Sequence, residues 1–321
     1  MNPSRREFIK TVSAISAGAM VDSNLFSGPI TAIAPSQPIC IFAKCLQFLD
    51  FPKLGEVVAR VGFKAAELTV RKGGQVLPEN VSTDLPGAIR TLKQSGINVP
   101  MIVTGITSPD DPLTENILRV ASAQGIGFYR MGYFTYDAGK SVTDNLAMHK
   151  TTMEKLEALN KKYGIQGCYQ NHSGTNVGGP VWDLHSIVKD CDPRFISVQY
   201  DIHHAVAEGG TAWPLGMSLL APWIKTIAIK DFVWAKANGK WNIKDVPLGE
   251  GMVDFNVYFK KYSGLGIAGP ITIHYEYDLG GAEHGNKTTA MSLTDISNYL
   301  KADLEWLRKK LGEHGLNGSF Y

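Results

Sequence analysis

The feature that most restricts the fold of this sequence is a regular alternation of short β-rich segments with longer amphipathic segments. The predicted strands are Ile39–Ala43, Ala65–Val70, Val99–Val103, Phe128–Gly132, Gly167–Asn171, Ile196–Asp201, Thr226–Asp231 and Ile271–Glu276. Helical patterns lie between them, including Leu54–Val61, Leu85–Ser95, Thr114–Gln124, Asn145–Tyr163 and Val181–Lys189. Strands that alternate with helices need right-handed crossovers and therefore form a parallel sheet.

Two architectures accommodate this alternation, an open doubly wound sheet and a closed barrel. Eight βα units with no change of composition that would mark a linker favour a single-domain α/β structure, the (β/α)8 or TIM barrel. A dinucleotide-binding sheet would need a glycine fingerprint after its first strand, whereas Lys44–Phe48 follows Ala43. In a barrel, functional side chains gather at the carboxyl ends of the strands.

The amino terminus carries a separate signal. Ser4–Lys10 contains the pair Arg5 and Arg6, and the apolar run Thr11–Val21 that follows is shorter than the roughly 20 residues needed to span a bilayer. This pattern is typical of a twin-arginine export signal, and a basic surface helix is the alternative. We predict a signal peptide at residues 1–28, a barrel at residues 29–321 and a periplasmic mature protein.

The charge balance restricts the partners. With 32 Lys+Arg and 30 Asp+Glu the net charge is +2, so there is no extended cationic surface for nucleic acid. We expect a small-molecule carbohydrate as the partner, no membrane contact once the signal is removed, and leave a homo-oligomer open. The cysteines lack the spacing of a zinc site and are expected to be free, buried thiols. They are Cys40, Cys45, Cys168 and Cys191.

Polar side chains accumulate at the predicted strand ends. They are Glu67, Gln170, Asn171, His172, Asp201, His203, His204, Lys230, Asp231 and Glu276. For any one of them a structural role at the barrel rim is the commoner explanation. Asp201 and Glu276, however, repel each other at one barrel mouth unless a cation or a proton lies between them. Oxygen and imidazole ligands of this kind suit a divalent metal such as Mn, Mg, Co or Zn.

Such a mouth suits one type of chemistry. A metal would polarise a carbonyl group while a carboxylate removes the proton α to it, the first step of sugar isomerases, epimerases and β-eliminating lyases. Lys230 can stabilise the enolate oxygen, and a rim salt bridge is an equally good explanation for it. Some tryptophans near the later loops can stack on a sugar, although packing is the simpler role for each. They are Trp213, Trp223, Trp234 and Trp241.

Six segments carry a family resemblance. They are Gly62–Leu68, Tyr169–His172, Tyr200–His204, Ile229–Phe232, Leu248–Phe255 and Gly269–Glu276. In order and spacing they resemble the xylose isomerase-like TIM-barrel superfamily, the sugar phosphate isomerase/epimerase group, across residues 39–310. The resemblance implies a divalent metal held by Glu, Asp, His and Glu on the fifth to eighth strands, with the first and last as a pair of acid/base groups.

The match to that ligand pattern is incomplete. Asp201 and Glu276 agree with it, whereas Gln170 replaces the fifth-strand acid and Ala228 replaces the seventh-strand His. A Gln offers a neutral carbonyl oxygen but cannot act as a general base.

The residues and the resemblance together predict a site. Its metal ligands are Asp201, Glu276, Gln170, His203 and His172. Its catalytic groups are Glu276 as the base, with His204 and Lys230. Its substrate contacts are Glu67, Asn171 and Trp234.

A site with one base and a separate acid favours elimination or hydration over epimerisation by two matched bases. We predict a metal-assisted, isomerase- or epimerase-like enzyme acting on a keto-sugar or keto-glycoside, with a lyase or hydratase outcome favoured. Export makes phosphorylated cytosolic intermediates poor candidates for the substrate. The alternative is a catalytically inactive, carbohydrate-binding barrel, because two expected ligands are missing. Endonuclease action, also known in this superfamily, is disfavoured because the zinc ligands and a basic face are missing.

Overall fold

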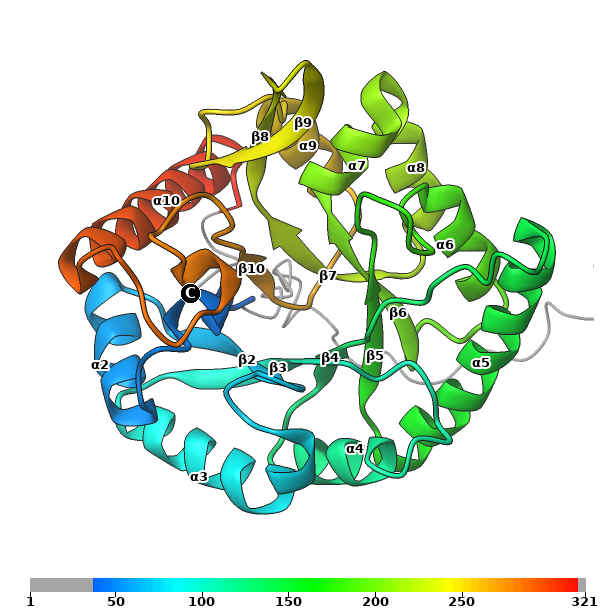
Figure 1. Cartoon of the computed structure of the whole chain (residues 1–321), viewed down its shortest axis with the longest axis horizontal. Coiled ribbons are helices and arrows are strands. Elements are labelled where there is room, and N and C mark those ends of the chain that lie inside the picture. Colours follow the sequence, from blue (N-terminus) through cyan, green and yellow to red (C-terminus); the bar gives the residue numbers. More distant parts are fainter. Residues whose placement is uncertain (1–36, 317–321) are drawn as a thin grey trace, which may run out of the picture. The chain divides into compact units, whose positions relative to one another are not determined.

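A computed structural model of the 321-residue chain describes residues 37–316. In this range parallel strands close a barrel in the order β1-β2-β3-β4-β5-β6-β7-β10 (Figure 1). The strands are β1 (Ile39–Phe42), β2 (Ala65–Val70), β3 (Asn98–Thr104), β4 (Phe128–Arg130), β5 (Gln166–Gln170), β6 (Ile196–Asp201), β7 (Ile224–Ile229) and β10 (Ile271–Ile273). The predicted (β/α)8 barrel is confirmed, and the predicted signal peptide lies outside the described residues.

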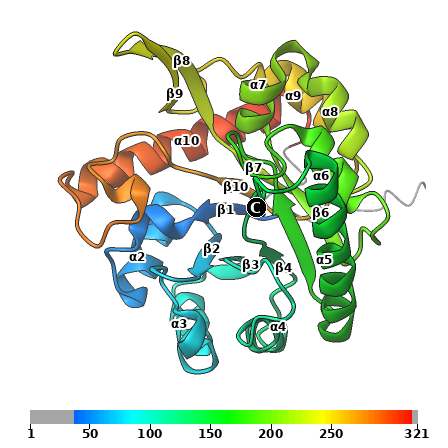
Figure 2. The same ribbon diagram turned by 45° about the vertical axis from the view of Figure 1, so that its right-hand side comes forward.

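Helices surround this barrel (Figures 1 and 2). They are α2 (Phe51–Val61), α3 (Val81–Gln94), α4 (Thr114–Ala123), α5 (Val142–Tyr163), α6 (Val181–Val188), α7 (Ile202–Gly209), α8 (Trp213–Leu220), α9 (Phe255–Tyr262) and α10 (Leu293–Glu313). Short 3-10 turns are η1 (Ala43–Leu46), η2 (Pro78–Asn80), η3 (Gly210–Ala212) and η4 (Ala282–His284). Several helices begin at a side-chain cap: Asp50, Ser141 and Ser292 accept backbone N–H groups at the starts of α2, α5 and α10.

The core lies between the strands and the helices. All residues of β1, β2 and β6 are buried, as expected for strands covered on both faces. The four cysteines are free and buried, which confirms the expectation from their spacing. Among the described helices, none combines the length and the apolar character that a membrane span requires.

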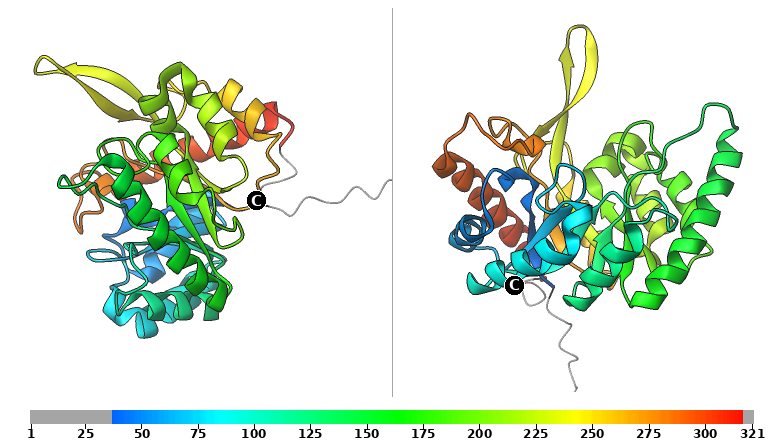
Figure 3. Two further views of the ribbon diagram at one scale, coloured as in Figure 1. Left: turned by 90° about the vertical axis from the view of Figure 1, so that its right-hand side faces the viewer. Right: turned by 60° about the horizontal axis from the view of Figure 1, so that its bottom comes forward.

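A hairpin departs from the predicted strand pattern. The predicted strand Thr226–Asp231 ends at Ile229, and β8 (Asp231–Ala237) and β9 (Lys240–Val246) then pair antiparallel and project from the barrel (Figure 3). Asn238 and Gly239 form its turn with φ of 51° and 78°, the left-handed geometry that two-residue hairpins favour. The Asp231 carboxylate accepts N–H groups from the loop after β9, so Asp231 is structural rather than part of the site.

Candidate active site

The two acids predicted to share the barrel mouth are bridged by a lysine. Lys230, directly after β7, places its Nζ 2.7 Å from Glu276 Oε2 and 3.5 Å from Asp201 Oδ2. Asp201 ends β6, and Glu276 follows β10. The ammonium group therefore relieves the repulsion that the sequence analysis assigned to a cation or a proton.

The bridge fixes the protonation of Glu276 and Lys230. Burial alone would raise the pKa of Glu276, but the ammonium groups of Lys230 and Lys44 hold it well below its usual value. Burial would lower the pKa of Lys230, and Asp201 and Glu276 together raise it instead. Lys44 Nζ lies 3.1 Å from Glu276 Oε1. Glu276 is therefore an ionised carboxylate, and Lys230 is a stable positive charge rather than a proton donor near neutral pH.

Exposure separates the two acids. The Glu276 side chain is 22% exposed, whereas that of Asp201 is completely buried. A ligand in the mouth therefore reaches Glu276, and Asp201 acts on it through Lys230.

The orientation of Gln170 corrects its predicted role. Its Oε1 accepts from Arg130 at 2.8 Å and from the Tyr133 hydroxyl at 2.6 Å, and its Nε2 donates to Asp201 Oδ2 at 2.8 Å. A guanidinium can only donate and an ionised carboxylate can only accept, so these neighbours permit a single amide orientation. The carbonyl oxygen predicted as a metal ligand is already used.

A histidine cluster lies beside Asp201. His203 Nδ1 and His204 Nδ1 are 3.1 Å apart, and the Ser173 hydroxyl is 2.8 Å from His204 Nδ1. The His172 ring packs on His204 with centroids 3.8 Å apart. Burial, together with the nearby charge of Lys230, lowers the pKa of His172 and holds that of His204 well below its usual value. The His204 ring is therefore neutral.

The residues do not fit the four-ligand metal centre that the resemblance implies. Gln170 turns its amide N–H group toward Asp201, the Ala228 side chain has no donor atom, and the Lys230 ammonium lies between Asp201 and Glu276.

A different group of three residues could hold a metal ion. Asp201, His203 and His204 each offer a ligand atom, and these atoms lie within 4.8 Å of one another. The Nε2 atoms of both histidines are buried without a hydrogen-bond partner among the described residues. That of His203 is 3.2 Å from Asp245 Oδ1 on the hairpin, outside hydrogen-bonding geometry. Unused imidazole nitrogens beside a carboxylate fit a metal, and this group shares Asp201 and His203 with the predicted set.

Two predicted substrate contacts are buried. Glu67 is completely buried, and its Oε1 accepts from Thr272 Oγ1 at 2.7 Å and Gln199 Nε2 at 3.1 Å. Asn171 exchanges hydrogen bonds with the backbone of Asp201, so it positions that residue. Trp234 is 40% exposed on the hairpin, and its contact with substrate stays a prediction.

The sequence analysis missed several residues of the mouth. Lys44 follows β1, Arg71 follows β2, Arg130 ends β4, and Tyr133 lies three residues further on. Each stands where a barrel strand ends, so the strand-end rule could have found them. Lys230 was the single basic residue among the strand-end residues that the sequence indicated.

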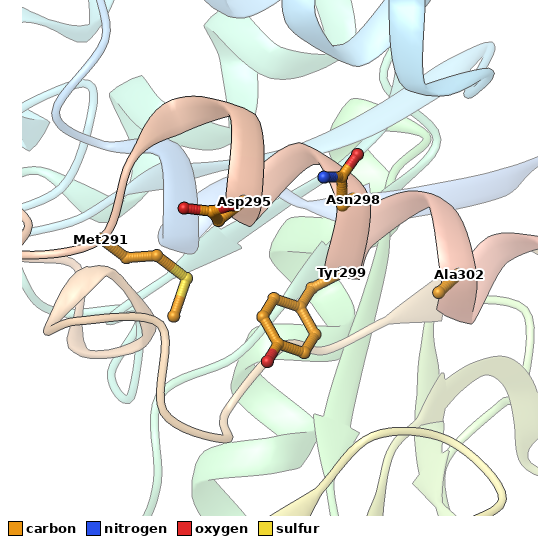
Figure 4. Close-up of a pocket in the computed structure, with 5 residues that line it drawn as sticks. All are labelled: Met291, Asp295, Asn298, Tyr299 and Ala302. Atoms are coloured by element: carbon orange, nitrogen blue, oxygen red, sulfur yellow. The ribbon is translucent and has the colours of Figure 1, made fainter.

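A separate surface pocket of about 470 Å³ lies over α10, away from the strand ends (Figure 4). It is lined by Met291, Asp295, Asn298, Tyr299 and Ala302. Asp295 is the single acidic residue among those that line it, and its carboxyl group accepts a hydrogen bond from the Ser292 hydroxyl at the start of the helix. No pair of reactive groups faces this pocket, so the barrel mouth remains the candidate site.

Comparison with known proteins identifies the family. Residues 56–310 match the xylose isomerase-like TIM barrel family, and the chain belongs to it. No match was found among curated proteins.

Solved structures share the fold at low sequence identity. The 3-keto-D-glucoside 4-epimerase of E. coli aligns with a TM-score of 0.60 and 14% identity over 86% of this chain and 99% of that one. A probable 3-DHS dehydratase from Bacillus anthracis gives 0.61 and 14% over 84% and 98%. A xylose isomerase-like protein from Mycobacterium smegmatis in complex with magnesium gives 0.58 and 15% over 84% and 98%.

The buried carboxyl group of Glu67 predicts a pH-dependent stability. Burial raises the pKa of Glu67 to about 7. Between its ordinary pKa and pH 7 the unfolded chain releases this proton first, so the folded state loses stability as the pH rises through that window. At pH 8 the loss is about 3 kcal/mol. Glu67→Gln, which keeps the acceptor oxygen, should therefore gain about 3 kcal/mol relative to wild type between pH 4.5 and pH 8.

Urea unfolding across that pH range measures the difference in free energy of unfolding. The exposed Glu79→Gln serves as the matched control and should follow wild type throughout. Parallel curves for Glu67→Gln and wild type would contradict the assignment.

Proposed function

We propose that the protein is an enzyme that removes the proton α to the carbonyl group of a keto-sugar or keto-glycoside. The bridge of Lys230 between Asp201 and Glu276 carries this proposal, because it places a carboxylate base and a fixed positive charge at one barrel mouth. Proton abstraction next to a carbonyl needs both groups. The fold shared with a keto-glucoside epimerase and a probable dehydratase supports this reaction class and a small carbohydrate substrate.

Each group has a proposed role in the first step. The Glu276 carboxylate accepts the α-proton, and the electrons of the broken C–H bond move onto the carbonyl oxygen. Lys44, partly exposed beside Glu276, donates a hydrogen bond to that oxygen. Lys230 stabilises the negative charge that develops there. His204 is the proposed partner for the second proton transfer when no metal ion occupies its Nε2, since its ring is neutral and that nitrogen has no hydrogen-bond partner among the described residues.

The residues on the fifth and sixth strands favour elimination or hydration over symmetrical epimerisation. Epimerisation by two matched bases needs a second accessible carboxylate. Gln170 stands at one such position and Asp201 is completely buried. A single carboxylate with a separate acid suits the loss of a β-leaving group or the addition of water.

We also propose that Asp201, His203 and His204 hold a divalent metal ion of the Mn, Mg, Co or Zn type. When bound, such an ion supplies Lewis-acid polarisation of a substrate oxygen. The Lys230 ammonium, 3.5 Å from the same Asp201 carboxylate, competes with the metal for that charge.

Replacement of Glu276 tests the proton abstraction. Glu276→Gln removes the base and should lower the exchange of the α-proton with deuterium from solvent by about a thousandfold or more. The measurement is NMR of keto-sugars and 3-keto-glycosides incubated with the enzyme in D2O, which detects abstraction whatever the final product. The exposed Asp278→Asn is the control and should exchange at the wild-type rate.

Two other outcomes have clear meanings. Exchange at the wild-type rate in Glu276→Gln removes that residue from the mechanism. Binding of these sugars without exchange by the wild-type protein supports the alternative, an inactive carbohydrate-binding barrel.

Metal analysis tests the three-residue group. Protein purified without added chelator should contain close to one equivalent of a divalent metal by plasma mass spectrometry. His203→Ala and Asp201→Asn should each lose it, and the exposed His284→Gln should retain it. Lys230→Met removes the competing ammonium and should raise metal affinity. Wild-type protein without metal after dialysis against each of the four ions would rule the site out.

The proposed periplasmic location rests on the predicted signal peptide at residues 1–28, and substitutions in that segment test it. Replacing Arg5 and Arg6 with Lys should retain the precursor in the cytosol, because the twin-arginine route reads the Arg pair. Cell fractionation followed by immunoblotting measures this, with Arg90→Lys in the barrel as the control. Unchanged export of the double variant would count against the signal.

A further inference from the structure

Four basic residues stand at the strand ends around the barrel mouth. They are Lys44, Arg71, Arg130 and Lys230, from the ends of β1, β2, β4 and β7. The carboxylates around them are Asp201, Glu276 and the hairpin residue Asp245, together with Glu67 near Arg130 and Asp111 beside Arg71. Both lysines form ion pairs with Glu276, whereas neither Arg71 nor Arg130 forms an ion pair with a carboxylate among the described residues.

Arg130 is a buried guanidinium with an unused donor. It is 5% exposed, and its hydrogen-bonded side-chain partner is the neutral oxygen of Gln170. Its Nε–H is buried without a partner among the described residues. The group lies over the rings of Phe42 and Tyr133, at 5.4 Å and 5.6 Å from their centroids, so it faces the mouth. Leaving a buried charged donor unpaired is costly, which points to a missing acceptor.

Arg71, which follows β2, is the second arginine at this end of the barrel. It is partly buried, and in the described part of the chain its side chain makes no hydrogen bond or ion pair. Its pKa is lowered by burial and by the like charge of Arg130, and Tyr133 and Glu276 act in the opposite direction. A cavity of about 190 Å³ lies alongside Arg71 and is also lined by Gly105 and Asp111. Neither guanidinium group is ion-paired with a carboxylate among the described residues, although Asp111 lines the cavity beside Arg71.

We propose that the mouth binds a substrate bearing an anionic group, a carboxylate or a phosphate, and that Arg130 and Arg71 hold that group. Planar guanidinium forks match both oxyanions. The anion fills the unused donor of Arg130 and removes the repulsion between the two arginines. The inference rests on the proposed function, since it names the substrate class of the same site, and it leaves Glu276 free to act on the carbon beyond the anion.

Binding of matched sugars tests this substrate class. Calorimetry with the full-length mature protein should show D-glucuronate, or D-glucose 6-phosphate, binding at least about tenfold more tightly than neutral D-glucose at low salt. Higher ionic strength should weaken the binding of the charged ligand and leave the affinity for the neutral one unchanged. The better of the two anions tells whether a carboxylate or a phosphate is preferred.

Variants identify the residues that hold the anion. Arg71→Met should lower the affinity for the preferred anionic sugar about tenfold without changing the affinity for D-glucose. Arg71→Lys should restore part of the lost affinity. Arg71 has no side-chain partner in the described residues, so the variant should fold; Arg90→Met on α3 is the matched surface control. Arg130→Lys should lose anion affinity while keeping the circular dichroism of wild type.

The results separate this inference from the proposed function. Equal affinity for charged and neutral sugars, equal losses for both in Arg71→Met, or no anion binding up to about 10 mM overturns the inference. Anion binding that depends on Arg71, with no deuterium exchange in any keto-sugar, supports the inference and contradicts the proposed reaction. Deuterium exchange in neutral keto-sugars, with no preference for anionic sugars, supports the proposed reaction and contradicts the inference.

Discussion

The interaction on which the site depends is the contact of one buried ammonium group with two carboxylates. Without Lys230, Asp201 would be a completely buried charge and would repel Glu276 across the mouth. With it, each acid has a positively charged partner, and Glu276 stays accessible. The surrounding contacts follow from this arrangement: Gln170 can turn its amide toward Asp201 because that carboxylate accepts, and Arg130 then takes the opposite end of the amide.

The fold and the location of the site could be predicted from the sequence, because both follow from local patterns. The β/α alternation determines the barrel, and the end of a strand places Glu276 and Asp201 at its mouth. The partners of each side chain could not be predicted, since they depend on tertiary distances. Asn171 is adjacent to Gln170 in sequence but holds the backbone of Asp201, and Glu67 lies below the mouth rather than in it.

The hairpin shows a second limit of sequence patterns. Asp231 follows Lys230 and resembles another acid of the site, yet its carboxylate accepts backbone hydrogen bonds from the loop that follows the hairpin. Asp245, far from any barrel strand end, instead reaches His203 at 3.2 Å. Neighbours in sequence diverge here because β7 ends at Ile229 and the chain leaves the barrel.

The pairing of β1 with β10 closes the barrel, and the contact of Lys44 with Glu276 crosses that seam between residues 232 positions apart in the chain. The site is therefore assembled from the first and last strands to be synthesised. A nascent or truncated chain that lacks β10 has neither the base nor the closed barrel. A ligand that contacts both sides of the seam stabilises the closed barrel, since it binds the closed form and shifts the folding equilibrium toward it.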